Sequence, residues 1–236
     1  MTGEGLAQFV ESRDESWRGL SLTMPLKRDI LPLLTSRHSL VDLVGGANTV
    51  LFADGGLRGF NTDVMGTVRS FTDAGVRGLE FVHILGAGAT AASVLVAVAQ
   101  LGATRALVSA RTPDRAQYLV ELGSRVGVDV VVRRWGVMDR SLIAPDAIIS
   151  TLPGGENDLA FAGSIRERSV LFDIAYDPWP SELARTWSDV GGRVISGFDL
   201  LINQAVGQVR VFVAGDPDAP LPDEPAVIAA MRAAVA

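Results

Sequence analysis

Two glycines at the end of an apolar run are the first residues whose spacing suggests chemistry. The run 81–85 is typical of a buried strand, and the apolar residues from about 89 onward are typical of a helix. The turn expected between them consists of Gly86, Ala87, Gly88, Ala89 and Thr90. The first glycine permits a sharp turn, and the second lets the backbone approach a pyrophosphate, which the N–H groups of the helix N-terminus bind. A dinucleotide site is therefore expected here, with an ordinary glycine turn as the alternative.

The end of the next expected strand decides which dinucleotide such a turn would hold. Arg111, Thr112 and Arg115 follow the strand 105–110, roughly twenty residues beyond the glycine turn. An acidic residue at this position accepts a hydrogen bond from the free ribose hydroxyl of NAD, whereas arginine and threonine can bind the 2′-phosphate of NADP. The sequence therefore favours NADP over NAD. Ordinary surface arginines at a capped helix start are the alternative.

Lys27 stands in an unusual place for its charge. Residues 19–23 alternate like a strand, Pro25 ends that strand, and a helix through Leu34 is expected to begin with Lys27 in its first turn. A cation there opposes the helix dipole, which favours cations at the other end, so a function would explain the position. A solvated surface lysine is the alternative.

A hairpin is predicted by the Asp-Gly-Gly sequence at 54–56, which lies between two apolar runs. It places Asn-Thr at 48–49 at the start of one strand and Asn-Thr-Asp at 61–63 beyond the end of its partner. Antiparallel pairing brings these polar residues together. A simple helix cap for the expected helix 64–74 is the alternative role for Asn61 or Asp63.

From residue 81 onward strands and helices alternate, which predicts an α/β fold with a Rossmann-type, doubly wound parallel sheet and right-handed crossovers. The expected strands are 81–85, 105–110, 128–132, 147–152, 170–174 and a short one at 194–195, with helices at 89–101, 113–123, 199–214 and from about 223. We expect an N-terminal α/β substrate lobe at 1–77, a dinucleotide-binding domain at 78–198, and C-terminal helices at 199–236 that return to the N-terminal lobe.

Composition excludes several classes of function. The formal net charge is −6 and there is no run of Lys or Arg, which argues against nucleic acid or an anionic membrane as the main partner. There is no cysteine and there are only two histidines, so a thiolate site or a histidine metal cluster is not expected. The uncharged stretch 81–104 is punctuated by glycine and contains Ser93 and Gln100, so we interpret it as a buried strand and helix rather than a membrane span. Without a signal peptide pattern, a cytoplasmic location is expected.

Several segments, in this order, resemble the shikimate dehydrogenase family. Residues 19–27 resemble its Gly-x-Asn-Val-Thr-x-Pro-x-Lys motif, with Ser21 in place of the more usual Asn. Residues 47–49 and 59–63 resemble its next two motifs, which contain Asn-Thr and Asn-Thr-Asp. The segment after Ala110 resembles its Asn-Arg-Thr-x-x-Arg phosphate clamp, with this alanine in place of Asn, and 173–178 and 197–205 resemble its two late motifs.

The resemblance implies an NADPH-dependent, reversible reduction of 3-dehydroshikimate to shikimate, a step of chorismate and aromatic amino-acid biosynthesis. It implies that Lys27 and Asp63 form the catalytic pair in a cleft between the lobes, and that no metal takes part. The substrate would be bound by Thr23, Asn48, Asp63 and Gln204, with Tyr176 beside them. The residues expected to line the cofactor are Gly86, Ala87, Gly88, Ala89, Thr90, Arg111, Thr112, Arg115, Ile174 and Gly197.

One departure from the family is expected to matter. Family members usually begin with a further strand and helix carrying a Ser-x-Ser pair that binds the substrate carboxylate, and residue 1 of this sequence lies after that segment, so the N-terminal lobe is expected to be incomplete. A quinate/shikimate dehydrogenase, a non-catalytic NADP-binding homologue and an unrelated two-lobed NADP reductase are the alternatives. Family members occur as monomers and homodimers, and either state is expected here.

Overall fold

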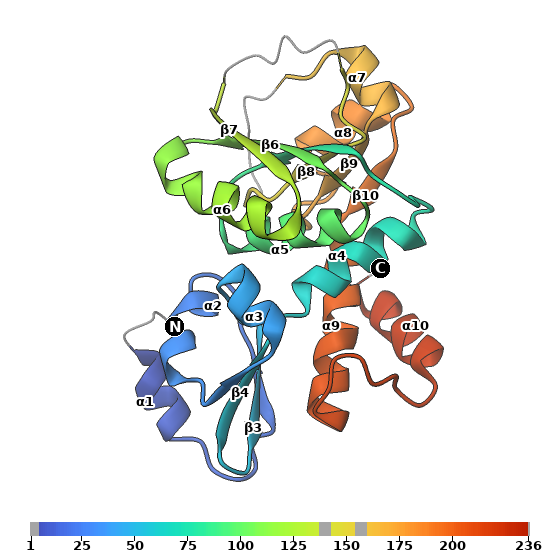
Figure 1. Ribbon diagram of the computed structural model, residues 1–236. Helices are drawn as coiled ribbons and strands as arrows, with labels where there is room; N and C mark the ends of the chain where they lie inside the picture. The colour runs from blue at the N-terminus through green and yellow to red at the C-terminus, as the bar shows by residue number, and fades with distance from the viewer. Residues whose placement is uncertain (1–4, 137–142, 154–159, 236) are drawn as a thin grey trace. The chain divides into compact units, whose positions relative to one another are not determined.

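The computed structural model describes residues 5–136, 143–153 and 160–235 (Figure 1). The chain divides into two compact units. The first unit combines Met1–Gly66 with Ile202–Ala236, and the second unit is Thr67–Leu201.

The first unit contains a four-stranded sheet. Its strands, in spatial order, are β1 (Gly19–Ser21), β3 (Thr49–Ala53), β4 (Gly56–Phe60) and β2 (Ser36–Arg37). β3 runs antiparallel to both β1 and β4, and Thr49 pairs with Phe60 at one end while Ala53 pairs with Gly56 at the other. This is the hairpin expected from the Asp-Gly-Gly turn.

Three short helices, α1 (Leu6–Glu11), α2 (Leu26–Asp29) and α3 (Ser39–Val44), belong to this unit. Their apolar side chains form one core cluster with the sheet, which consists of Leu6, Val10, Leu22, Ile30, Val41, Ala47 and Val50. The helix expected through Leu34 is shorter than predicted, because a 3₁₀ helix, η2 (Leu31–Leu33), replaces its second half. Pro32 has no N–H to continue the α-helical ladder. The dipole argument for Lys27 loses its basis, since α2 has only four residues.

The opposite face of the hairpin packs on a long helix. Leu51 and Phe60 cluster with Val211 of α9 (Gly197–Ala214), because residues adjacent along a strand point to opposite faces of the sheet. α9 is joined to α10 (Glu224–Ala234) by Arg210, whose Nε and Nη2 each donate to a carboxylate oxygen of Glu224 at 2.7 Å. The Glu224 carboxylate raises the pKa of Arg210 above its ordinary value.

The second unit contains a six-stranded parallel sheet. The strands, in spatial order, are β10 (Val194–Ser196), β9 (Val170–Asp173), β8 (Ala147–Ser150), β5 (Phe81–Leu85), β6 (Arg105–Ala110) and β7 (Asp129–Arg134). α5 (Ala89–Gln100) and α6 (Gln117–Val126) lie on one face, and α7 (Gly163–Arg168) and α8 (Glu182–Ser188) on the other (Figure 1). The strand order reverses between β5 and β8, which is the switch point at which doubly wound folds bind ligands. The predicted fold class is confirmed.

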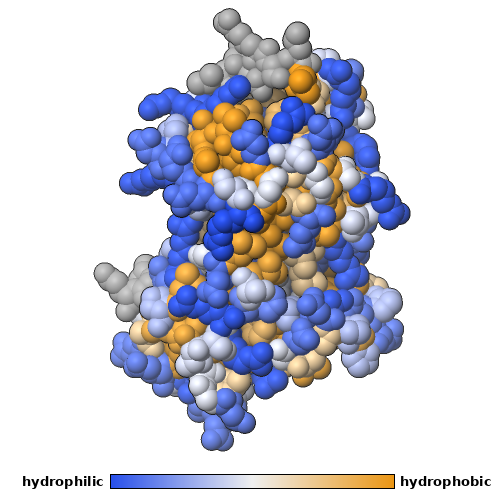
Figure 2. Space-filling view, viewed as in Figure 1, coloured by the Kyte–Doolittle hydropathy of each residue, from blue (hydrophilic) through white to orange (hydrophobic). Residues whose placement is uncertain are grey.

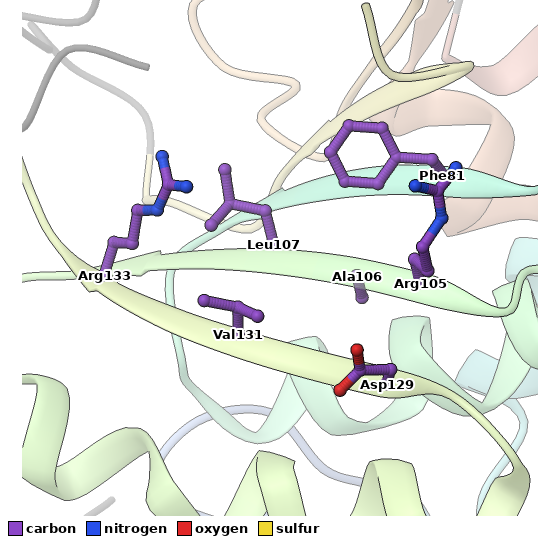
Figure 3. Close-up of a pocket in the computed structure, with 7 residues that line it drawn as sticks. All are labelled: Phe81, Arg105, Ala106, Leu107, Asp129, Val131 and Arg133. Atoms are coloured by element: carbon purple, nitrogen blue, oxygen red, sulfur yellow. The ribbon is translucent and has the colours of Figure 1, made fainter. Parts of the chain in front are cut away.

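Among the residues that the structure describes, those on the face that carries α7 and α8 cover the sheet unevenly. Trp187 of α8 is fully buried in a cluster with Leu85, Ile148 and Leu171. Over the other half of the sheet lies a shallow hollow of about 130 Å³, lined by Phe81, Arg105, Ala106, Leu107, Asp129, Val131 and Arg133 (Figure 3). Apolar residues gather over β6 and β7 in Figure 2, and Val131 is 49% exposed. None of the predicted site residues lines this hollow.

Among the helices that the structure describes, none is both long and apolar enough to cross a bilayer. The described residues also contain no cluster of three or more His, Asp or Glu side chains arranged to hold a metal ion.

Candidate active site

An ion pair between Lys27 and Asp63 lies in the first unit. The Lys27 Nζ donates to Asp63 Oδ2 at 2.6 Å, and the two side chains are only 12% and 6% exposed. Lys27 belongs to α2, and the backbone carbonyl of Lys27 accepts a hydrogen bond from the N–H of Ala47 at 2.8 Å. Asp63 is the first residue of α4 (Asp63–Asp73). The two sequence segments that carry opposite charges therefore meet in a largely buried, charge-assisted hydrogen bond.

Asn48 connects this pair to its surroundings. Its Nδ2 donates to Asp63 Oδ1 at 2.9 Å, to Thr62 Oγ1 at 2.9 Å and to Gln204 Oε1 at 3.2 Å. Its Oδ1 accepts from the backbone N–H of Thr62 at 2.9 Å. Asn48 is 1% exposed, so these bonds satisfy a polar side chain that water does not reach. The network fixes both oxygens of Asp63, one on the lysine and one on the amide.

Asn61 explains why the Asp63 carboxylate is available for this network. The Asn61 Oδ1 accepts from the backbone N–H of Asp63 at 3.1 Å and of Val64 at 3.4 Å, and so caps α4. The sequence left either Asn61 or Asp63 as the possible cap of this helix, and in the structure the cap is Asn61. The Asp63 side chain, two residues further on, pairs with Lys27.

A close approach of two helices positions Gln204. A Cβ built on Gly66 of α4 would lie 2.8 Å from the backbone nitrogen of Gln204 and 2.9 Å from its Cβ, so only glycine permits this contact with α9. The side chain of Gln204 consequently reaches Asn48 from a segment far away in the sequence.

The structure does not bring every predicted substrate residue into this network. Lys27, Asn48, Asp63 and Gln204 are linked by direct hydrogen bonds. Thr23 lies exposed beyond the end of β1, in the same unit. Tyr176 belongs to the second unit, where it is 47% exposed and its ring centroid lies 5.7 Å from that of Phe198.

The glycine turn of the second unit leaves β5 as expected. Gly86 has φ +102°, a left-handed conformation, and a Cβ there would lie 2.5 Å from Thr151 Oγ1. Gly88 is the N-cap residue of α5 and is exposed, and a Cβ built on it meets nothing within 4 Å. The turn therefore offers an open space bordered by backbone N–H groups at a helix N-terminus, which fits a pyrophosphate.

The predicted 2′-phosphate residues stand at the carboxyl end of β6, beside the strand that carries the glycine turn. Arg111, Thr112 and Arg115 are exposed, and their side chains make no hydrogen bond or ion pair with any residue that the structure describes. These donors are therefore available to an anionic ligand. Two further predicted cofactor residues lie together: a Cβ on Gly197 would meet the carbonyl oxygen of Ile174 at 2.1 Å, so glycine is required there.

One feature of the site was not predicted from the sequence. The Tyr118 hydroxyl of α6 lies within hydrogen-bond distance of the carbonyl oxygens of Ala87 and Gly88, and no sequence pattern marks this residue. Lys27 was predicted, and the sequence holds a further signal for it, because it is the only lysine among the 21 Lys and Arg residues of the chain. Arginine keeps its proton under ordinary conditions, so this lysine is the only one of these cations suited to proton transfer.

The chain is similar to known proteins in both sequence and structure. No protein-family model matches it. Shikimate dehydrogenase (NADP(+)) of Methanothermobacter thermautotrophicus is 29% identical over 222 residues, which cover 91% of this chain and 78% of that protein. The enzyme of the same name from Methanococcoides burtonii is 32% identical over 205 residues, which cover 84% of this chain and 73% of that protein.

This chain is also similar to a solved structure. The crystal structure of shikimate dehydrogenase from Mycobacterium tuberculosis superimposes with a TM-score of 0.84 at 35% identity, and the match covers 99% of this chain and 85% of that one. Sequence identity of this size over most of both chains, together with the shared architecture, shows common descent. The chain belongs to the shikimate dehydrogenase family.

Proposed function

We propose that this chain catalyses the NADP-dependent interconversion of 3-dehydroshikimate and shikimate, the step that its family contributes to chorismate and aromatic amino-acid biosynthesis. The observation that carries the proposal is the hydrogen bond of 2.6 Å between the Lys27 ammonium and Asp63, in a network with Asn48 and Gln204. When bound, NADPH supplies the hydride. The work that remains for the protein is to bind the substrate, hold it in place and move one proton.

Lys27 is proposed to supply that proton. A carbonyl that accepts a hydride develops negative charge on its oxygen, and a nearby ammonium stabilises this charge and protonates the resulting alkoxide. In the direction of shikimate oxidation the neutral amine takes the proton from the hydroxyl group. Asp63 holds the lysine side chain in place, because its own carboxylate is fixed at both oxygens. Metal chemistry is not needed for this step.

Asn48, Asp63 and Gln204 are proposed to bind the ring hydroxyls of the substrate, and Thr23 and Tyr176 are proposed to contribute as well. An amide group can both donate hydrogen bonds to neighbouring hydroxyls and accept them, and a carboxylate can accept several. The Asn48 Nδ2 already lies near three acceptors, although an amide nitrogen carries only two hydrogens. In the free protein these three acceptors share two hydrogens, so a substrate hydroxyl can donate to one of them.

The cofactor is proposed to place its pyrophosphate at the turn 86–90 and its 2′-phosphate against Arg111, Thr112 and Arg115. Support comes from the open space above Gly88 and from the exposed basic side chains that follow the end of the neighbouring strand. Ile174 and Gly197 are proposed to line the rest of the cofactor site. We further propose a cytoplasmic enzyme that acts as a monomer or homodimer without nucleic-acid or membrane partners.

The test is the reduction of NADP⁺ by shikimate, followed at the nicotinamide absorbance, with quinate and NAD⁺ as competing substrate and cofactor. We expect turnover with shikimate and NADP⁺, and much weaker turnover with NAD⁺, because Arg111 replaces the acidic residue that a ribose hydroxyl needs. A preference for quinate with NAD⁺ would favour a quinate/shikimate dehydrogenase. Tight binding of NADP⁺ without turnover of either substrate would favour a non-catalytic homologue.

A further inference from the structure

We propose that Tyr118 is a positioning residue for the cofactor: its hydroxyl group holds the turn after β5 so that two backbone N–H groups face the pyrophosphate. The inference rests on the proposed placement of the pyrophosphate at this turn. Tyr118 itself is not proposed to touch the cofactor.

The contact joins two segments that are distant in the sequence. The Tyr118 oxygen lies 3.1 Å from the carbonyl oxygen of Ala87 and 2.8 Å from that of Gly88. Both distances are in the range of a hydroxyl–carbonyl hydrogen bond, with the shorter one near the most common value. A hydroxyl carries one hydrogen, so the two carbonyl groups share it. The Tyr118 ring is only partly exposed and comes from the first turn of α6.

Peptide geometry turns this contact into an orientation of N–H groups. In a planar trans peptide the C=O and the following N–H point in opposite directions. When the carbonyl of Ala87 points toward Tyr118, the N–H of Gly88 points away from it, and the carbonyl of Gly88 sets the N–H of Ala89 in the same way. Neither N–H can bond within α5, because the first N–H groups of a helix have no preceding carbonyl. They are therefore the groups that an anion at this helix N-terminus would use.

The same contact keeps the partial negative charge of two carbonyl oxygens away from the proposed pyrophosphate position. Carbonyl oxygens carry partial negative charge and repel a phosphate, so a flipped peptide at 87–88 or 88–89 would replace an attractive group by a repulsive one. The Tyr118 hydroxyl keeps both oxygens on the side of α6.

The turn gains from such support because the peptide between residues 87 and 88 has no side chain of the turn to hold it. Glycine has access to far more backbone conformations than other residues, and this turn has two glycines. The N-cap residue of α5 is Gly88, whose missing side chain makes no capping hydrogen bond. At one end of the turn, the N–H of Gly86 donates to the carbonyl of Ser109 at 2.9 Å. At the end nearer the helix, the carbonyl of Gly88 accepts from the N–H of Ala91 at 3.0 Å and from the Tyr118 hydroxyl, whereas the carbonyl of Ala87 is held from the side by Tyr118.

The test is Tyr118→Phe, which removes the hydroxyl and keeps the ring. Affinity is measured by calorimetry for NADP⁺ and for adenosine 2′-monophosphate, a ligand that carries the 2′-phosphate and no pyrophosphate. Without the hydroxyl, conformations that bind poorly become populated, and the apparent affinity falls with the fraction of competent turn. We expect the Kd of NADP⁺ to rise about 2- to 10-fold, the value of one neutral hydrogen bond, with the Kd of the monophosphate unchanged. In turnover, KM for NADP⁺ should rise while kcat at saturating NADP⁺ stays the same.

Arg111→Ala is the matched control, since loss of the 2′-phosphate contact should weaken both ligands. An unchanged Kd of NADP⁺ in Tyr118→Phe would overturn the inference, and so would an equal weakening of both ligands, which would mean that Tyr118 acts through the 2′-phosphate segment. Gly88→Ala, measured in parallel, separates the two levels of the proposal. If it leaves NADP⁺ binding intact, the placement of the pyrophosphate is wrong; if only Tyr118→Phe has no effect, the placement stands and the positioning role fails.

Discussion

Gly88→Ala should affect the stability of the fold and the affinity for the cofactor differently. The backbone of Gly88 has φ −89° and ψ −173°, an extended conformation open to any residue, and an added Cβ meets nothing within 4 Å. Alanine therefore fits without strain, and it removes conformational freedom from the unfolded chain, an effect of about 0.4–1 kcal/mol. Gly88 is also the N-cap residue of α5, where alanine is less favourable than glycine by about the same amount. We expect the two effects to offset each other, so that the free energy of unfolding and the Tm change little.

Cofactor binding, by contrast, should weaken. The methyl group would occupy the space proposed for the pyrophosphate and push it away from the N–H groups of the turn. The loss of one charge-assisted hydrogen bond, about 1.5–3 kcal/mol, weakens NADP⁺ by roughly 10- to 100-fold. Thermal unfolding without ligand and calorimetric titration with NADP⁺ measure the two effects on the same preparation.

Gly163→Ala is the matched control for this variant. Gly163 is the first residue of α7, and a Cβ built there also meets nothing within 4 Å. This substitution should leave the Kd of NADP⁺ unchanged. If Gly88→Ala binds NADP⁺ as tightly as the unmodified protein, the glycine turn does not hold the pyrophosphate and the reasoning is refuted.

Three further predictions concern cofactor choice, stability and helix packing. Arg111→Ala should weaken NADP⁺ by about 10-fold or more and leave NAD⁺ unaffected, which binding titrations with both cofactors measure; equal losses would contradict the 2′-phosphate role. Glu224→Gln should lower the free energy of unfolding by about 1–3 kcal/mol, because the largely buried guanidinium of Arg210 loses its counter-charge, and denaturant titration would contradict this if the midpoint did not move. Gly66→Ala should cost about 1–3 kcal/mol, since its Cβ would lie 2.8 Å from the Gln204 nitrogen, and should raise KM for shikimate; an unchanged Tm would show that the helices separate freely.

The parts of the fold that could be predicted are those with strong local signals. The strand 81–85, the glycine turn and the hairpin at 54–56 each follow from a short run of residues, and the structure has all three. Helices α3 and α8 were not predicted, because each has only six or seven residues and depends on a cap. His38 caps α3 through a ring nitrogen, and Ser181 caps α8 while its hydroxyl also donates to Asp173 at the end of β9.

The candidate site shows more clearly that local sequence patterns do not predict tertiary contacts. The pairing of Lys27 with Asp63 was expected from family resemblance, because 36 positions separate the two residues and no local pattern joins them. The contact arises from tertiary structure: the hairpin brings Asn48 beside Asp63, and the close approach at Gly66 adds Gln204. The roles of Thr23 and Tyr176 stay predictions.

The central claim is that Lys27 transfers a proton, and one set of kinetic measurements tests it directly. Turnover of shikimate with saturating NADP⁺ is measured for Lys27→Met, which removes the charge, and for Lys27→Arg, which keeps the charge and does not release a proton. Calorimetry with NADP⁺ and thermal unfolding establish that each variant is folded and binds its cofactor. We predict that kcat falls by about 10²- to 10⁴-fold in both variants, the usual contribution of general acid–base catalysis, while the Kd of NADP⁺ is unchanged. Wild-type turnover in either variant would contradict the proposed mechanism.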